Sequence, residues 1–258
     1  MTPSLFDMHV HLDFMRDMQA VAQEAEQLGL GLFATTVTPA GYERTRDALD
    51  DTPNVWVGVG LHPWWVADGR CGERDAMHTA ELARTARYVG EIGLDRSPKH
   101  VPEGSFEQQL KAFETIVTTC AQTSDAASPK VLSIHSVQAA GVALDALECT
   151  GALGTCRCIF HWFSGSSDEL HCAVKAGCWF SVNEMMLRTK RGREYARQLP
   201  ASRLLLETDL PPGEDVPFAA SQIRESLART AGQLASIRGT TVTDICDLTC
   251  HNSLDVLR

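Results

Sequence analysis

The chain has 258 residues and a formal net charge of −10. This length suits two small domains or one (β/α) barrel, and a fold of this size is stable without a disulfide or a structural metal. The acidic charge excludes a generally basic protein that coats nucleic acid. It does not exclude an enzyme that meets nucleic acid locally, through metal ions and a basic patch.

Cysteine usage and hydropathy indicate the compartment. There are nine cysteines and no C-x-x-C pair, which fits reduced thiols better than a disulfide framework. No segment has the unbroken apolar length of a membrane span, and the N-terminus lacks the features of a signal peptide. We therefore expect a soluble, cytoplasmic protein without a membrane partner, with a monomer as the default.

Short apolar runs alternate with helix-patterned segments along the chain. The first helical pattern covers residues 17–28, and two more lie within 218–257. Strict alternation implies parallel pairing with right-handed crossovers, and eight such units imply a closed barrel. We therefore predict an α/β fold, a (β/α)8 TIM barrel, as a single domain over 1–258. The predicted strands are 4–10, 31–37, 54–60, 88–92, 131–135, 156–161, 177–182 and 203–207.

The first predicted strand contains Asp7-Met8-His9-Val10-His11. Positions i and i+2 of a strand face the same way, so His9 and His11 are expected to project side by side. Two neighbouring imidazoles suit a divalent metal ion, although an isolated H-x-H pattern is a weak signal. The remaining ligands must come from other strands.

Later predicted strands end on further side chains that bind metals, namely Glu91, His135, His161 and Asp209. The carboxyl ends of barrel strands converge on one face, where active sites lie. Four histidines and two carboxylates exceed the three ligands of one catalytic ion and suit two ions about 3.5–4 Å apart. We predict that Glu91 bridges the ions and that Asp209 binds one ion and orients or deprotonates the attacking water. Mg²⁺, Mn²⁺ and Zn²⁺ all accept such ligands.

Candidate substrate contacts rest on weaker patterns. His62 is equally consistent with a phosphate contact and with a packed loop histidine, and we expect it in a different sector from the main ligands. Trp64 is placed to stack on a base or to serve only as packing, together with Trp65. Ser164 lies in a small-residue stretch whose N–H groups could hold a phosphate.

A basic segment follows the seventh predicted strand. Residues 187–197 include five basic residues and one acid. Such a run is as often a solvated helix face as a binding surface. Its place at the predicted barrel mouth favours contact with a polyanion through Arg188, Lys190 and Arg191.

Taken together and in order, these motifs resemble the TatD family of metal-dependent deoxyribonucleases, a group of amidohydrolase-like barrels. The resemblance covers nearly the whole chain. The matching segments are Asp7–Asp13, Gly58–Pro63, Val89–Asp95, Ser133–Ser136, Phe160–Ser166 and Leu204–Pro211.

The resemblance implies a hydrolase of phosphodiester bonds that uses two divalent metal ions. Its typical activity is 3′-to-5′ exonuclease action on single-stranded DNA or damaged ends, with DNA as the partner. His62 would help to bind the scissile phosphate. The implied ligand sets are His9, His11, Glu91 and Asp209 for one ion, and Glu91, His135 and His161 for the other.

Three positions depart from the family pattern. Arg96 stands where an aromatic residue is common, Val137 where an arginine is common, and 211–215 in place of an Arg-Asn-containing stretch. These positions shape the substrate cleft, so the departures bear on substrate and polarity more than on metal binding. Segment 183–187 resembles a divergent branch, some members of which occur in bacterial anti-phage defence cassettes, which implies partners from such a system.

Two alternatives stay open. A metal-dependent amidase or lactonase that acts on a small molecule could use the same ligands. Such relatives often bridge their metals with a carbamylated lysine, so Glu91 in that place favours the nuclease. The second alternative is a non-catalytic barrel in a multiprotein assembly, and the intact ligand set argues against it.

Overall fold

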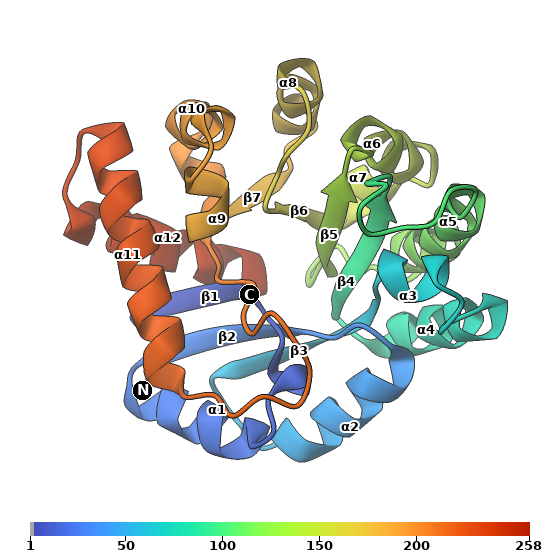
Figure 1. The fold of residues 1–258 in the computed structure, drawn as a ribbon, viewed down its shortest axis with the longest axis horizontal. Coiled ribbons are helices and arrows are strands. Elements are labelled where there is room, and N and C mark those ends of the chain that lie inside the picture. Colours follow the sequence, from blue (N-terminus) through green and yellow to red (C-terminus); the bar gives the residue numbers. More distant parts are fainter. Residues whose placement is uncertain (1–2) are drawn as a thin grey trace.

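The structure is a computed structural model that describes residues 3–258. Its eight strands are parallel and follow one another in sequence order, from β1 (Leu5–Val10) to β8 (Leu204–Leu206). The helices lie outside the strands (Figure 1), and the predicted α/β barrel is confirmed. The strands between the first and the last are β2 (Leu30–Thr35), β3 (Val55–Leu61), β4 (Tyr88–Asp95), β5 (Val131–Val137), β6 (Arg157–His161) and β7 (Trp179–Val182).

The connecting helices turn an apolar face toward the strands. Helix α5, for example, buries Phe113, Ile116 and Val117, which recur at helical spacing. No helix in the described part of the chain is both long and apolar enough to cross a bilayer. In chain order the helices are α1 (Met18–Gln27), α2 (Pro39–Leu49), α3 (Pro63–Ala67), α4 (Glu73–Thr85), α5 (Phe106–Thr123), α6 (Ala140–Cys149), α7 (Ala152–Thr155), α8 (Ser167–Lys175), α9 (Glu184–Leu187), α10 (Lys190–Gln198), α11 (Ala220–Arg238) and α12 (Val242–Leu257).

Strand β4 is longer than predicted, and this changes the place of its carboxylate. The strand was expected to end at residue 92, close after Glu91, but it continues to Asp95. Gly93 makes this possible, because a Cβ on it would lie 2.1 Å from the carbonyl oxygen of His135, and its φ is +149°. Glu91 therefore projects from within the strand, beside β5. At the other end of the barrel wall, β7 and β8 are shorter than predicted.

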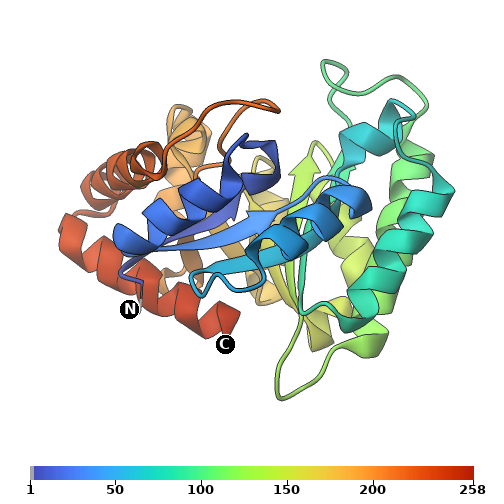
Figure 2. The same ribbon diagram turned by 90° about the horizontal axis from the view of Figure 1, so that it is seen from below.

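An apolar plug closes the barrel at the end where the strands begin. Phe6, Phe33 and Leu205 form a buried cluster with Val256 and Leu257 of α12, together with other side chains. The last carbonyl groups of this helix are also bound, since Tyr88 donates to Leu257 at 2.9 Å. Figure 2 shows α12 below the strands, whereas the loops after β4 and β8 rise on the opposite side.

The seam between β8 and β1 is closed by an irregular segment rather than a regular ladder. The Asp209 N–H donates to the His9 carbonyl at 2.9 Å, and the His11 N–H donates to the Leu210 carbonyl at 2.9 Å. The buried Asp7 carboxyl accepts the Thr208 N–H at 2.9 Å and the Thr208 hydroxyl at 2.5 Å. Burial raises the pKa of Asp7 to about 8, so this carboxyl is largely neutral at physiological pH.

We expect Asp7→Ala to lower the free energy of unfolding by about 2–4 kcal/mol, because it leaves buried N–H groups without an acceptor. Asp7→Asn should cost less than about 1 kcal/mol, since its amide oxygen can accept the same N–H groups while its NH2 group donates to the Thr208 hydroxyl. Urea denaturation of both variants measures the difference. Equal loss in the two variants would contradict the role given to the neutral carboxyl.

Candidate active site

A pocket of about 650 Å³ opens at the carboxyl ends of the strands. Of the predicted site residues, the ones that line it are His11, His62, Trp64, Glu91, His135, His161, Ser164 and Asp209. His9 lies beneath them and is fully buried. The barrel topology thus brings together side chains from positions 9 to 209 of the sequence.

The Glu91 carboxylate lies at the centre of this cluster and is 1% exposed. Its Oε2 is 3.2 Å from His9 Nε2 and 3.3 Å from His11 Nε2. The prediction that these two imidazoles project side by side is therefore confirmed. Asp209 completes this group, with Oδ1 at 3.7 Å from His9 Nε2 and 3.4 Å from His11 Nε2.

The other oxygen of Glu91 faces a second group. Its Oε1 is 2.8 Å from His135 Nδ1, 2.9 Å from His161 Nε2 and 3.2 Å from His62 Nε2. The expectation that His62 occupies a different sector is wrong. Strands β3 and β4 shift register between Val59 and Leu61, an irregularity that a strictly alternating strand pattern does not predict.

The donor atoms of both groups fit metal ions. Ligands of one ion at about 2.0–2.2 Å lie about 2.8–3.6 Å from one another in tetrahedral or octahedral arrangements. The distances across the first group are 3.2–3.7 Å, with only the His9–Asp209 separation slightly above the expected range, and those from Glu91 Oε1 in the second are 2.8–3.2 Å. Both groups also mix imidazole and carboxylate donors, the set that Mn²⁺ and Zn²⁺ accept.

Hydrogen bonds at the outer ring nitrogens tell metal ligands from other histidines. A metal-binding imidazole keeps its proton on the outer nitrogen and offers the inner lone pair. His9 Nδ1 lies 2.8 Å from the Ser133 hydroxyl, and His135 Nε2 lies 3.0 Å from Asp95 Oδ2. His11 Nδ1 and His161 Nδ1 face the carboxylates of Asp13 at 3.8 Å and Glu207 at 3.6 Å. His9 and His135 thus have the outer hydrogen bond of a metal ligand, whereas His11 Nδ1 and His161 Nδ1 are buried without a hydrogen-bond partner among residues 3–258. The inner nitrogens of all four rings face Glu91.

His62 has the opposite arrangement. Its Nδ1 accepts the backbone N–H of Trp64 at 3.1 Å, at the start of α3. Burial lowers the pKa of His62 to about 4, so the ring is neutral. Its single proton must then lie on Nε2, which points at Glu91. His62 belongs spatially to the second group but is built as a hydrogen-bond donor.

The charges in the cluster stabilise one another. Although burial opposes ionisation, the imidazoles that face Glu91 hold its pKa well below the usual value. Despite its own burial, His161 has a pKa well above the usual value because Glu91 and Glu207 face it. Ion binding must displace such protons, so metal affinity is expected to fall as the pH falls.

Several contributors were not predicted as site residues. Asp95, Ser133 and Glu207 are buried and face the outer nitrogens of the imidazoles. Glu207 also accepts from Ser181 and from Asn183, the latter at 2.8 Å. A signal was available, because each lies an even number of positions from a predicted ligand on the same or the next strand segment.

Some of the predicted substrate-binding residues lie in the pocket, and others lie on the surface outside it. Trp64 and Ser164 line the pocket, whereas Arg188, Lys190 and Arg191 are exposed on α9–α10 and outside its lining. The helix start near Ser164 is already filled, since Glu169 accepts the Ser166 N–H at 2.7 Å and the Gly141 N–H at 2.7 Å. Glu169 therefore already accepts the Ser166 N–H at the start of α8, and the phosphate contact near Ser164 stays a prediction.

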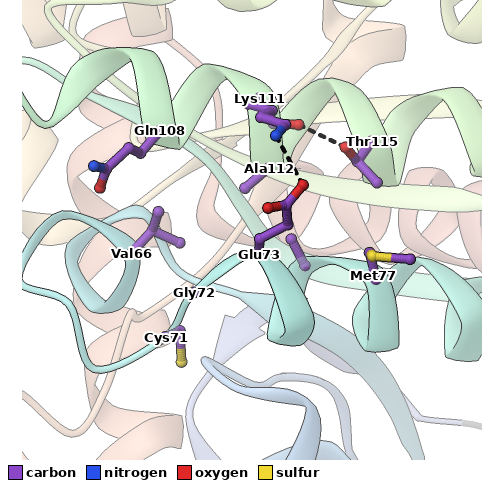
Figure 3. A pocket seen from close by; sticks show the side chains of 10 residues that line it. Val66, Cys71, Gly72, Glu73, Met77, Gln108, Lys111, Ala112 and Thr115 are labelled. Carbon is purple, nitrogen blue, oxygen red and sulfur yellow. Dashed lines mark hydrogen bonds and ion pairs between the residues drawn. The ribbon is translucent and has the colours of Figure 1, made fainter.

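A second cavity of about 350 Å³ lies away from this cluster, between α4 and α5 (Figure 3). Glu73 and Lys111 form an ion pair of 2.8 Å there, and the Cys71 thiol is buried in its wall. Burial raises the pKa of this thiol to about 11, so the thiol is not a nucleophile at neutral pH.

The sequence is similar to a family of known proteins. A model of the family described as TatD related DNase matches residues 6–258. The chain belongs to this family. It is 25% identical to the human deoxyribonuclease TATDN3, over 97% of this chain and 93% of that protein.

Two bacterial proteins are about as similar to this TatD-family chain. It is 24% identical to the uncharacterized metal-dependent hydrolase YabD of Bacillus subtilis, over 98% of this chain and 99% of that protein. It is also 24% identical to the 3′-5′ ssDNA/RNA exonuclease TatD of Pantoea vagans, over 98% and 99%.

Solved structures support the fold. YjjV, a TatD homologue of Escherichia coli, superposes with a TM-score of 0.79 at 22% identity, over 99% of this chain and 98% of that chain. An organophosphorus hydrolase of Deinococcus radiodurans gives 0.57 at 12% identity, over 98% and 92%. Identities this low show only that the TatD-family chain shares their barrel.

Because His62 is a hydrogen-bond donor and His161 is a candidate ligand, their replacement should affect metal binding differently. We expect His161→Ala to weaken Mn²⁺ binding at least about tenfold, and His62→Ala to change it less than about threefold. Calorimetric titration with Mn²⁺ measures both. The exposed His78 provides a control for loss of an imidazole, as His78→Ala. A similar loss for His62→Ala and His161→Ala would show that His62 is a ligand.

Proposed function

We propose that this protein is a phosphodiesterase that uses two divalent ions, and that it acts as a 3′-5′ exonuclease on single-stranded DNA or DNA ends. One observation carries the proposal: each oxygen of Glu91 faces a separate group of donors. A carboxylate shared in this way is suited to bridge two metal ions. Membership of the TatD family and the names of the human and Pantoea relatives support DNA as the substrate.

Two overlapping sets of residues would hold the two ions. His9, His11, Glu91 and Asp209 would hold one ion, and Glu91, His135 and His161 the other. The chemistry supplied by bound ions would be Lewis-acid polarisation of the phosphate and activation of a water molecule.

Two side chains are free to act on the reacting groups. Asp209 is 24% exposed toward the pocket, and only its Oδ1 faces the two histidines of β1. Although burial opposes ionisation, His11, His161 and His9 lower the pKa of Asp209, so the group is ionised and its second oxygen is available to accept a proton from the attacking water. The Nε2–H of His62 can donate to an oxygen of the scissile phosphate.

We expect Glu91→Ala and Asp209→Asn each to lower kcat/KM on single-stranded DNA by about a thousandfold or more. Glu91→Ala should also abolish binding of both ions, whereas Asp209→Asn should weaken one. An anomalous scattering map from crystals soaked in Mn²⁺ counts the ions. Full activity in either variant, with the fold intact by circular dichroism, would sink the catalytic proposal.

A direct comparison separates the nuclease from the small-molecule hydrolase. The nuclease should shorten a 5′-labelled single strand stepwise from its 3′ end in Mg²⁺ or Mn²⁺. The wild-type protein is assayed in parallel on lactones and dihydropyrimidines. Turnover of these compounds without DNA cleavage would favour the amidase or lactonase.

We also propose that the exposed basic trio of α9–α10 contacts the DNA backbone beyond the pocket. Replacing Arg188, Lys190 and Arg191 with Gln should reduce the slope of log Kd against log salt by about 2, because each single-strand phosphate contact adds about 0.7. A matched control neutralises three exposed cations on other helices, Arg46, Arg84 and Lys111. An unchanged slope in the trio variant would make it a solvated helix face.

The thiols support a reducing, cytoplasmic location as part of the proposal. All nine cysteines are free in the structure, and Cys120, Cys158 and Cys178 are buried among apolar side chains. An oxidising compartment typically selects disulfides in secreted proteins.

A further inference from the structure

The pocket around the metal-binding cluster has an unusual lining for a site that meets a polyanion. Within residues 3–258, no lysine or arginine lines it. Beyond the histidines and acids, its walls are mainly aromatic and aliphatic, with Phe14, Trp64, Trp65, Trp162, Met185 and Leu210. A substrate group next to the scissile phosphate must therefore be held by stacking and apolar contact rather than by cationic side chains.

Trp64 is the aromatic ring that is best fixed in this wall. Its Nε1–H donates to Asp95 Oδ2 at 2.7 Å, and its backbone N–H donates to His62. Its ring is stacked with that of His100, at a centroid distance of 4.5 Å and an angle of 15° between the planes. This is the geometry of a nucleobase on a tryptophan.

His100 is suited to give up this position. It lies in the segment 96–105 between β4 and α5, and its side chain is exposed. A planar base that enters the pocket can take the place of the imidazole without disturbing a buried group. The ring of Trp64 stays in place because Asp95 holds its edge.

Asp95 holds two different parts of the site with one oxygen. Its Oδ2 accepts from Trp64 Nε1 and also from His135 Nε2, at 3.0 Å. Its Oδ1 accepts the Ser97 N–H at 2.6 Å, and the residue is fully buried. A carboxylate fixed in this way orients an aromatic face and a metal-binding ring together.

We propose that the terminal base of the substrate stacks on Trp64 in the place of His100, and that Asp95 is the positioning residue that holds both this ring and His135. The inference rests on the proposed phosphodiesterase function. It names the feature that the pocket recognises, a planar base beside the scissile phosphate, and it predicts that a substrate end with a base is preferred over an abasic end.

The test uses two single-stranded oligonucleotides that differ only in the 3′-terminal residue, thymidine in one and an abasic tetrahydrofuran in the other. Binding is measured by fluorescence anisotropy in Mn²⁺, with a phosphorothioate at the last linkage to slow hydrolysis. Cleavage is measured as kcat/KM on the ordinary linkage. The wild-type protein should prefer the thymidine end by about 5- to 150-fold, the range that one base–aromatic stack provides.

The variants separate the platform from the positioning residue. Trp64→Leu should reduce the preference below about twofold through KM, with Mn²⁺ affinity retained. Asp95→Asn should reduce the preference and also weaken Mn²⁺ binding about 10- to 100-fold. His100→Ala should keep the preference. Trp56→Leu, at the half-buried tryptophan near the start of β3, is the control for loss of an indole.

Each result has a defined meaning. Retention of the preference in Trp64→Leu, or its loss in His100→Ala, would overturn the platform. Unchanged Mn²⁺ affinity in Asp95→Asn would overturn the positioning role. Equal binding and equal cleavage of both oligonucleotides would overturn the inference and leave the phosphodiesterase function standing. A binding preference without cleavage would leave the inference standing and overturn the proposed function.

Discussion

The site depends on one buried carboxylate that faces five imidazoles. Placing Glu91 in the barrel interior is unfavourable unless opposite charge or metal compensates for the loss of hydration. The surrounding histidines supply that compensation from both sides. The two carboxylate oxygens of Glu91 point to different groups of side chains. The contacts with histidine that compensate for its burial therefore also divide the cluster into two groups.

The ring nitrogens that point away from Glu91 contact residues of the barrel wall. Ser133 and Asp95 fix the rings of His9 and His135 through hydrogen bonds, so these two proposed ligands are already oriented. His62 is fixed in the reverse sense by the backbone of α3. Donor distances alone place His62 with Glu91 and His135 as a group that could hold a metal. The tautomer gives the more specific assignment, because a neutral ring has only one lone pair to offer.

Much of the centre was predictable from the sequence because two simple rules apply to it. Side chains two positions apart in a strand share a face, which places His9 and His11 together. Parallel topology brings the carboxyl ends of distant strands to one end of the barrel. The register shift between β3 and β4 and the close approach of Gly93 to β5 escape these rules, so His62 was expected elsewhere and β4 was expected to be shorter. The capping box Ser166–Glu169 was readable as a pattern and explains why that helix start is filled. The double hydrogen bond of Asp95 depends on side-chain rotamers across three elements, and no pattern in the sequence predicts it.

The irregular seam between β8 and β1 carries Asp209 in a left-handed conformation, with φ of +60°, directly beside the backbone of His9. The segment that completes the barrel wall is thus the one that completes the first ligand group. During synthesis, a nascent chain that has emerged only as far as β7 already contains His9, Glu91 and His161 but lacks this closing segment. Such a chain can neither close its wall nor assemble the full centre. Closure of the barrel wall and completion of this donor group would therefore coincide during folding.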